Sequence, residues 1–299
     1  MNTDMKVLVI VVTYNALQWI DKCLVSLLNS TIPVDCIVID NMSTDDTVKY
    51  IKESYQWVHL VVSEKNLGFG QGNNIGLQYA IDNNYEFVYL LNQDAWIFPD
   101  TLEKLINVYN LHNEYGILSP FQMQANEEHL DENFTISLSR IKDDYISDFY
   151  LNQFLDVYSL PDVMAAHWLI SRMCLLKVGG FSPTFIQYGE DNNYIERVTY
   201  HGFKIGVVPF AKAIHDRAKR AITKKRIMDK FYTNYLVESS SITNYSISFW
   251  VRLFYYSVVY IVSYRTLDPV KSALRIIKQY PKIRHNRELS KNECAFLKP

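Results

Sequence analysis

The chain of 299 residues carries 30 Lys and Arg against 32 Asp and Glu, and 48% of its residues are hydrophobic. This balance, together with 10 glycines and 9 prolines, excludes intrinsic disorder, collagen-like repeats and low-complexity sequence as descriptions of the whole chain. The length suits one large domain with an appendage. We therefore expect a globular fold around a substantial core.

The cysteines and the amino end indicate a cytoplasmic protein. Four cysteines occur without paired spacing, a pattern that favours neither a zinc cluster nor a disulfide framework and fits a reducing compartment. The first apolar run, at residues 7–12, is too short for the core of a signal peptide. We interpret this run as a buried strand.

Charge is distributed unevenly along the chain. Residues 1–211 contain 12 Lys and Arg and 26 Asp and Glu, whereas residues 212–299 contain 18 and 6. The strongest basic cluster comprises Lys219, Arg220, Lys224, Lys225 and Arg226. Two interpretations stay open: a solvated face that complements the acidic body, or a surface for an anionic substrate or lipid headgroups.

Short apolar runs alternate with amphipathic stretches over the first hundred residues. This alternation predicts an α/β domain in which a doubly wound, mostly parallel sheet is covered by helices on both faces. Ligands of such sheets lie beyond the carboxyl ends of the strands. The residues that directly follow the predicted strands are Thr13 to Asn15, Asp40 and Asn41, Asn66 to Gly76, and Asn92 to Asp94.

The second half of the chain is less regular. We expect a helix over residues 99–113, long loops with short elements over 122–160, a helix near 188–203, and a strand that ends before Ala213. Beyond residue 216 the pattern is helical to about residue 280.

An apolar, aromatic stretch at residues 246–264 lies within this helical part. Arg252 interrupts it, and the uncharged run of 12 residues that follows is shorter than the roughly 20 residues that a membrane span needs. We expect a packed helix, with a helix lying in the membrane interface as the alternative. Its aromatic residues Phe249, Trp250, Phe254 and Tyr255 would suit a homodimer surface if they were exposed.

Asp94, at the end of a predicted strand, is a candidate ligand for Mg2+ or Mn2+, which bind carboxylates together with substrate phosphates. Alone, such an aspartate is more often a turn former. Asp40, after the second strand, would accept hydrogen bonds from a base or ribose, or would cap the next helix.

Four glycines, at positions 68, 70, 72 and 76, follow the third predicted strand. We expect a loop there that lets backbone N–H groups approach a diphosphate, with a helix beginning near Gly72. The spacing departs from the dinucleotide fingerprint, which argues against a nicotinamide-dependent oxidoreductase.

Glu190 and Asp191 open a predicted helix, and His215 follows 24 residues later at a strand end. Acids at a helix start are normally favoured by the helix dipole alone. Here they could instead supply a general base and a metal or phosphate ligand.

Taken in order, these segments resemble family 2 glycosyltransferases with the GT-A fold, closest to the rhamnosyltransferase-like branch. The resemblance covers residues 6–215 and rests on the following residues: Thr13-Tyr14-Asn15, Asp40-Asn41-x-Ser43-x-Asp45, Asn66-x-Gly68-Phe69-x-x-Gly72-Asn73-Asn74-x-Gly76, Leu91-Asn92-x-Asp94, Gly179-Gly180-Phe181, Tyr188-Gly189-Glu190-Asp191, Gly202, Pro209 and His215.

The resemblance implies an inverting sugar transfer from a UDP- or dTDP-sugar donor to a glycan or lipid-linked acceptor in surface polysaccharide synthesis. Asp191 would be the general base, Asp94 and His215 would hold Mg2+ or Mn2+, and Trp168 and Glu190 would contact the acceptor. The nucleotide side of the cleft would be formed by Thr13, Asn15, Asp40, Asn66, Gly68, Gly72, Asn74 and Asn92.

The resemblance also implies a domain plan. Residues 1–215 would form the GT-A domain, with a nucleotide-binding half at 1–98 and an acceptor half at 99–215, and residues 216–299 would form a basic helical extension. No nucleic acid partner is expected, and peripheral association with the inner face of the cell membrane is one interpretation of the basic extension.

Some positions depart from the family pattern. Many relatives have an acid where Asn92 stands, so metal binding would depend more on the diphosphate. Asn193 stands where this branch often has an aspartate, and Asn73 where other branches have an arginine, so positive charge for the diphosphate would come from residues 217–226. The alternative hypothesis is a catalytically weak nucleotide-sugar binding protein. For Trp168, core packing is the alternative to stacking on a sugar.

Overall fold

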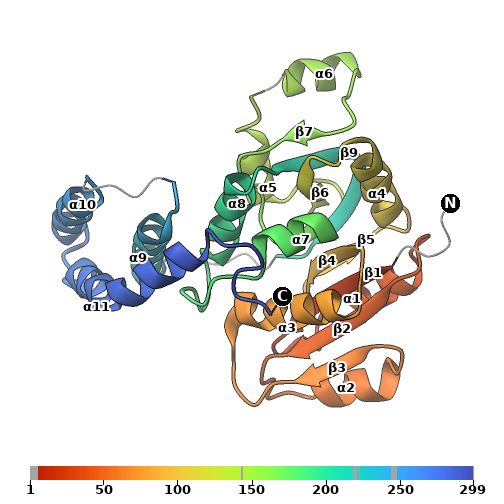
Figure 1. Cartoon of the computed structure of the whole chain (residues 1–299), viewed down its shortest axis with the longest axis horizontal. Helices are drawn as coiled ribbons and strands as arrows, with labels where there is room; N and C mark the ends of the chain where they lie inside the picture. The colour runs from red at the N-terminus through yellow and green to blue at the C-terminus, as the bar shows by residue number, and fades with distance from the viewer. Residues whose placement is uncertain (1–5, 143, 218–220, 222, 244–247, 299) are drawn as a thin grey trace.

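The computed structural model describes residues 6–142, 144–217, 221, 223–243 and 248–298. In these residues nine strands form one sheet in the order β3-β2-β1-β4-β8-β6-β9-β5, with β7 beside β9 (Figure 1). The strands are β1 (Val7–Thr13), β2 (Asp35–Asp40), β3 (His59–Val62), β4 (Phe87–Asn92), β5 (Ala95–Ile97), β6 (Tyr115–Met123), β7 (Tyr158–Ser159), β8 (His167–Ser171) and β9 (Lys204–His215).

The expectation of a mostly parallel sheet holds for its first half. Strands β3, β2, β1 and β4 are parallel neighbours. The second half is mixed, because β8 runs antiparallel to both β4 and β6, and β5 and β7 run antiparallel to β9. Strand β9 also extends to His215, beyond the predicted end before Ala213.

Helices cover both faces of the sheet. They are α1 (Ile20–Leu28), α2 (Thr47–Ser54), α3 (Gly68–Asp82), α4 (Thr101–Leu111), α5 (Glu132–Leu138), α6 (Tyr145–Leu151), α7 (Arg172–Val178) and α8 (Glu190–Tyr200). Side chains alternate between the two faces of a strand: Leu8 and Ile10 of β1 join the apolar cluster beneath α3, α7 and α8, whereas Val7, Val9 and Val11 join that beneath α1 and α4. This two-sided burial explains why β1 is continuously apolar.

The predicted glycine-rich loop is wrong, because these glycines form the first turns of α3. A Cβ atom at Gly72 would lie 2.9 Å from Val12, and one at Gly76 would lie 2.7 Å from Ile10, both on β1. Glycine is therefore needed here for close packing of a helix on a strand. The close packing of Gly72 on Val12 explains why position 72 is a glycine, so a contact with a nucleotide is not needed to explain it.

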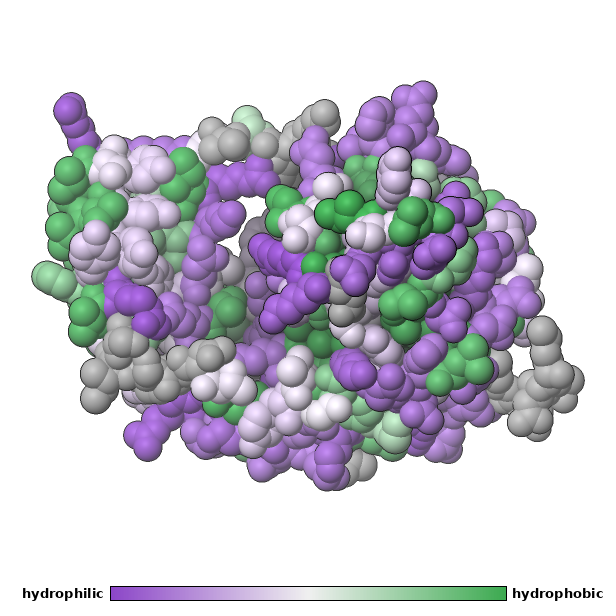
Figure 2. Space-filling view, turned by 90° about the horizontal axis from the view of Figure 1, so that it is seen from above, coloured by the Kyte–Doolittle hydropathy of each residue, from purple (hydrophilic) through white to green (hydrophobic). Residues whose placement is uncertain are grey.

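Three helices follow the sheet, as the predicted helical extension requires: α9 (Lys224–Ser240), α10 (Ser248–Tyr264) and α11 (Asp268–Leu289). They pack around a separate apolar cluster that includes Phe231, Leu253 and Ile276. They lie to one side of the sheet, and a hollow separates part of them from the body of the molecule (Figures 1 and 2). Lys219 and Arg220 of the predicted basic cluster lie outside the described residues.

The carboxyl end of the chain returns to the body. The Gly180 N–H donates to the Ala295 carbonyl over 2.8 Å, and the Lys298 N–H donates to Oε1 of Gln78 over 2.7 Å. The boundary proposed at residue 216 stays a prediction. Within the described ranges, none of the helices combines the length and the apolar character that crossing a bilayer requires.

The close contact between α3 and β1 gives a stability prediction. Gly76→Ala should destabilise the fold by about 1–3 kcal/mol, since the added Cβ overpacks a well-filled interior. Urea unfolding would measure the loss. Ile10→Val in the same chain removes one of the atoms that the new Cβ meets, so it should recover part of the loss; full additivity of the two substitutions would contradict this packing.

Candidate active site

The carboxyl ends of β1, β2 and β4 lie side by side. The sheet register pairs Thr13 with Asp40 and Val12 with Asn92. The predicted strand-end residues therefore meet at one edge of the sheet, as parallel pairing requires.

Asp40 is a buried anchor at this edge. Its carboxylate accepts hydrogen bonds from the Thr13 hydroxyl over 3.1 Å, and from the backbone N–H and hydroxyl of Ser43 over 2.9 and 2.5 Å. Thr13 and Asp40 are both fully shielded from solvent. The expectation that they hold the nucleotide directly is therefore not met in this conformation, and what they do here is fix the loop after β2.

Asn15 and the loop after β2 are joined by hydrogen bonds. Asn15 has a left-handed backbone, with φ of 51°, its N–H donates to the Ser43 hydroxyl over 2.9 Å, and its Oδ1 accepts from the Thr44 N–H over 2.8 Å. Asn15 is partly exposed, so it stays available as a predicted nucleotide contact.

Asn41 links this loop to the start of α3, a role that the predicted site did not include. Its Oδ1 accepts from the Leu67 N–H over 2.6 Å, and its Nδ2 donates to Asn66 Oδ1 over 3.1 Å. Asn66 Oδ1 also accepts from the Gly68 N–H over 2.9 Å. The position of Asn41 directly after a strand was the signal available in the sequence.

Asn74 joins α3 to the loop before α8. Its Oδ1 accepts from the Phe181 N–H over 2.7 Å, and its Nδ2 donates to the Phe181 carbonyl over 2.9 Å. Gly68 meets the same loop, since a Cβ there would lie 1.8 Å from the Ile186 carbonyl oxygen. The geometry gives Asn74 and Gly68 packing roles; a contact with a nucleotide stays a prediction for both.

The pair that the sequence predicts as metal ligands comes together. Asp94 Oδ1 lies 3.6 Å from His215 Nε2, because Ala95 of β5 pairs with His215 of β9. Two ligand bonds of about 2.1 Å can span this separation, and an oxygen with an imidazole nitrogen is a donor set that divalent ions accept. Among the described residues, no group of three or more His, Cys, Asp or Glu could hold a metal ion by itself, so further ligands would have to come from a substrate.

Asp131 completes this cluster, and the sequence analysis missed it. Its Oδ2 lies 3.7 Å from His215 Nδ1 and 3.5 Å from Arg217 Nε, while its Oδ1 caps α5 by accepting from the N–H groups of Asn133 and Phe134 over 2.9 Å. A carboxylate hydrogen-bonded to one imidazole nitrogen orients the other toward a metal. At 3.7 Å, Asp131 lies beside His215 Nδ1 without a hydrogen bond, and this buried nitrogen has no hydrogen-bond partner among the described residues. The only available signal was an aspartate before a short helix in a stretch read as loops.

Charge in the cluster favours an ionised Asp94. Burial would raise the pKa of its carboxyl, but His215 and Arg217 outweigh that effect and hold the pKa below its usual value. Asp94 is therefore an anion at neutral pH, as a cation ligand must be.

Arg217 connects the two halves of the site. Its charge acts on the carboxyl groups of both Asp94 and Asp191. The charge of Arg217 therefore lowers the pKa of the predicted metal ligand and opposes the rise in the pKa of the predicted base.

The start of α8 carries two adjacent acids, of which Glu190 is buried and Asp191 is partly buried. The Glu190 side chain is 6% exposed, and its Oε2 has no hydrogen-bond partner among the described residues. Burial and the charge of Asp191 raise the pKa of Glu190 to about 7. Burial also raises the pKa of Asp191, against the opposing effect of the Asn192 N–H that donates to Asp191 Oδ1 over 2.9 Å.

Trp168 is fully buried in β8, between Phe181 and Tyr194. The expectation that it binds the acceptor is wrong for this conformation, because its ring belongs to the core. Its neighbour His167 is also buried: Nε2 donates to the Ile214 carbonyl and Nδ1 accepts from the Tyr89 hydroxyl, both over 2.9 Å. Burial lowers the pKa of His167 to about 3, so this histidine is neutral. Its hydrogen bond to the Ile214 carbonyl fixes the end of β9.

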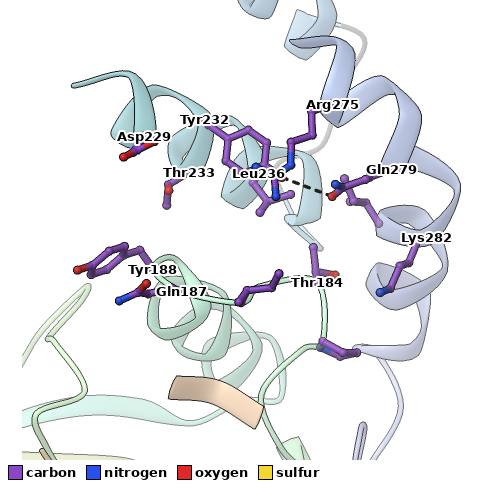
Figure 3. Close-up of a pocket in the computed structure, with 13 residues that line it drawn as sticks. Thr184, Gln187, Tyr188, Asp229, Tyr232, Thr233, Leu236, Arg275, Gln279 and Lys282 are labelled. Carbon is purple, nitrogen blue, oxygen red and sulfur yellow. Dashed lines mark hydrogen bonds between the residues drawn. The ribbon is translucent and has the colours of Figure 1, made fainter. Parts of the chain in front are cut away.

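A cavity of about 530 Å³ lies beside the start of α8 (Figure 3). Residues 183–188, which lead into α8, form one wall, and α9 and α11 form the others. Arg275 and Lys282 line it and make no ion pair within the described residues, and Arg275 lies 4.4 Å from the centre of the Tyr232 ring. This polar and aromatic lining is of a kind that can receive a sugar.

Comparison with known proteins identifies the family. The model of Glycosyl transferase family 2 matches residues 8–179, more than half of the chain. The chain belongs to glycosyl transferase family 2. The rhamnosyltransferase-like resemblance agrees with its relatives, which include dTDP-rhamnosyl transferase RfbF of Shigella flexneri, 22% identical over 69% of this chain and 67% of that protein.

Two other relatives extend the comparison. The chain is 26% identical to N-acetylglucosaminyl-diphospho-decaprenol L-rhamnosyltransferase of Mycobacterium tuberculosis, over 70% of this chain and 76% of that protein. It is 23% identical to low-salt glycan biosynthesis hexosyltransferase Agl10 of Haloferax volcanii, over 60% of this chain. The chain spans 58% of the length of Agl10 and 15% of glycosyltransferase GlyA of Streptococcus pneumoniae.

Solved structures confirm the predicted GT-A fold with C-terminal helices. S. aureus TarS 1-349 in complex with UDP-GlcNAc matches 96% of this chain and 88% of that chain with a TM-score of 0.58 and 18% identity. GalNAc-T7 with UDP, GalNAc and Mn2+ matches 80% of this chain and 51% of that chain with a TM-score of 0.59 and 14% identity.

The buried acid at the start of α8 gives a pH prediction. The raised pKa of Glu190 means that the folded state keeps this proton to about pH 7, whereas the unfolded chain loses it near pH 4.5. The free energy of unfolding should therefore fall as pH rises through this window, by up to about 3 kcal/mol for this group at about 1.4 kcal/mol per pH unit.

Glu190→Gln removes the titrating group but keeps its shape. Its unfolding free energy, measured in urea at pH 4.5, 6 and 7.5, should decline less steeply than that of the unsubstituted protein. Parallel curves for the two proteins would show that Glu190 has an ordinary pKa in the folded state.

Proposed function

We propose that this chain transfers a sugar, with inversion, from a UDP- or dTDP-sugar to a glycan or lipid-linked acceptor in surface polysaccharide synthesis. The observation that carries the proposal is the pairing of Asp94 with His215 at the strand ends, beside Arg217, whose charge also acts on Asp191. Family membership supports the reaction class. The similarity to RfbF, a dTDP-rhamnosyl transferase, and to the mycobacterial N-acetylglucosaminyl-diphospho-decaprenol L-rhamnosyltransferase supports a nucleotide-sugar donor and a lipid-linked acceptor.

The donor would lie along the edge formed by β1, β2 and β4. Asn15 and Asn92 are partly exposed polar side chains there, and Arg217 is available to the diphosphate. Asp94 and His215 would hold Mg2+ or Mn2+, with Asp131 orienting His215 as a positioning residue. When bound, the ion offsets negative charge on the departing nucleoside diphosphate.

Asp191 is the proposed general base. It would take the proton of the acceptor hydroxyl while that oxygen bonds to the anomeric carbon and the bond from this carbon to the diphosphate breaks. The raised pKa of this partly buried carboxyl suits the role, because a base gains proton affinity as its pKa rises toward the operating pH. The acceptor would approach from the cavity beside Tyr188, which directly precedes α8.

The working location proposed for this enzyme is the cytoplasm, at the inner face of the cell membrane. Nucleotide-sugar donors and a lipid-linked acceptor would meet there. The catalytic scheme itself does not depend on this location.

Asp191→Asn tests the assignment of the base. The substitution keeps the shape of the side chain but cannot accept the proton, so turnover should fall by about 10²- to 10⁴-fold, while the dissociation constant for UDP or dTDP stays the same. Product formation from radiolabelled donor and calorimetric binding of the nucleotide would measure the two quantities.

Asp82→Asn, at an exposed position on α3, is the matched control and should keep full turnover. Near-normal turnover in Asp191→Asn would remove Asp191 as the base. Nucleotide binding without any transfer by the unsubstituted protein would favour the nucleotide-sugar binding protein instead.

A further inference from the structure

Helix α10 has two apolar faces. Phe249 and Leu253 point into the cluster shared with α9 and α11 and are at most 3% exposed. The opposite face carries a second apolar stripe, with exposed fractions from 45% to 74%: Val251, Phe254, Tyr255, Val258 and Val262. Their spacing of i, i+3, i+4, i+7 and i+11 places them along one side of the helix.

Helix α11 continues the pattern. Leu267, just before the helix, and Val270, Leu274 and Ile277 within it are 66%, 37%, 59% and 52% exposed. They recur at intervals of three or four residues and so share one side of α11. We call these four residues and the five of α10 the outer apolar surface.

Figure 2 shows hydrophobic residues, in green, at the end of the molecule that the C-terminal helices form, away from the sheet domain. A soluble protein rarely leaves so continuous an apolar surface uncovered unless a partner or a membrane binds it.

Basic side chains border this surface. Lys271 and Lys278 each follow a stripe residue of α11 by one position, which places them about 100° around the helix from it. Both are exposed, as is Arg265 in the turn between α10 and α11. Residues 212–299 together carry 18 Lys and Arg against 6 Asp and Glu.

The positive charge around the outer apolar surface distinguishes between two partners that could cover it, a second copy of the chain and an anionic lipid bilayer. A second copy would bring the same excess of positive charge against itself in an isologous contact, which is unfavourable. An anionic bilayer instead offers phosphates to the lysines and hydrocarbon to the apolar side chains, and each basic residue near such a surface strengthens binding electrostatically.

We propose that the outer apolar surface docks this protein on an anionic lipid bilayer. The α10 and α11 stripes lie in the interfacial region, and Lys271, Lys278 and Arg265 contact lipid phosphates. This binding is peripheral and needs neither donor nor acceptor, so it deepens the location in the proposed function and can be tested separately from sugar transfer.

Flotation of the full chain with lipid vesicles tests the proposal. One set of vesicles contains phosphatidylglycerol and phosphatidylethanolamine, and the other contains phosphatidylcholine alone. Binding to the anionic vesicles should be at least about tenfold tighter and should weaken with added salt. Equal binding to both, or binding to neither, would overturn the proposal.

The double variant Phe254→Asp with Val258→Asp places charge in the stripe without touching the helix core. It should lose at least about tenfold in affinity for the anionic vesicles, since apolar contact is replaced by charges that must stay hydrated. The matched control, Leu111→Asp with Ile146→Asp, alters residues of α4 and α6 that are 73% and 79% exposed and should bind as the unsubstituted protein does.

Two further measurements complete the design. Thermal unfolding must show that the double variant is folded, and Lys271→Gln with Lys278→Gln, which leaves the stripes intact, should reduce the preference for anionic lipid. Light scattering that shows a dimer of the unsubstituted protein, converted to a monomer by the stripe variant, would overturn the proposal in favour of a second copy. Unchanged vesicle binding by either variant would also contradict it.

Discussion

The antiparallel pairing of β5 with β9 is the constraint on which the site depends. It sets Ala95 opposite His215, and the Asp216 N–H donates to the Asp94 carbonyl over 2.8 Å beside it. Residues separated by more than a hundred positions are thereby held within ion-pair distance. Loss of this register would separate Asp94 from His215. Asp131 and Arg217 would then no longer lie beside this pair.

The same pairing determines where the C-terminal helices begin. The chain leaves β9 at His215, passes Arg217 and enters α9, which packs against the start of α8. A Cβ at Gly189 would lie 2.7 Å from Val237 of α9, so this glycine permits the close approach. The basic helices are therefore structurally connected to the acid that we propose as base, and membrane docking through their outer surface would orient that side of the molecule.

Much of the site could be predicted because strand ends in a parallel sheet meet. The positions of Thr13, Asp40, Asn92 and Asp94 follow from three apolar runs and that rule. The sequence did not reveal that Thr13 and Asp40 are buried, because their exposure depends on the loop that Ser43 folds over them.

Other features depend on contacts that no local pattern records. The glycines of α3 resemble a loop, yet Gly72 and Gly76 are explained by residues of β1 at least 60 positions earlier, and Gly68 by Ile186 more than 100 positions later. Asp131 was missed because its partners, His215 and Arg217, lie on a distant strand and the segment after it. The burial of Trp168 likewise depends on Phe181 and Tyr194.

The most direct test of the site is calorimetric binding of UDP and dTDP, each with and without Mn2+, to the unsubstituted protein and to Asp94→Ala. The geometry of Asp94 and His215 predicts that Mn2+ strengthens binding of at least one of the two nucleotides and that Asp94→Ala loses this gain while keeping the metal-independent affinity. Binding that is the same with and without metal, or a metal gain that persists in Asp94→Ala, would contradict the proposed role of this pair.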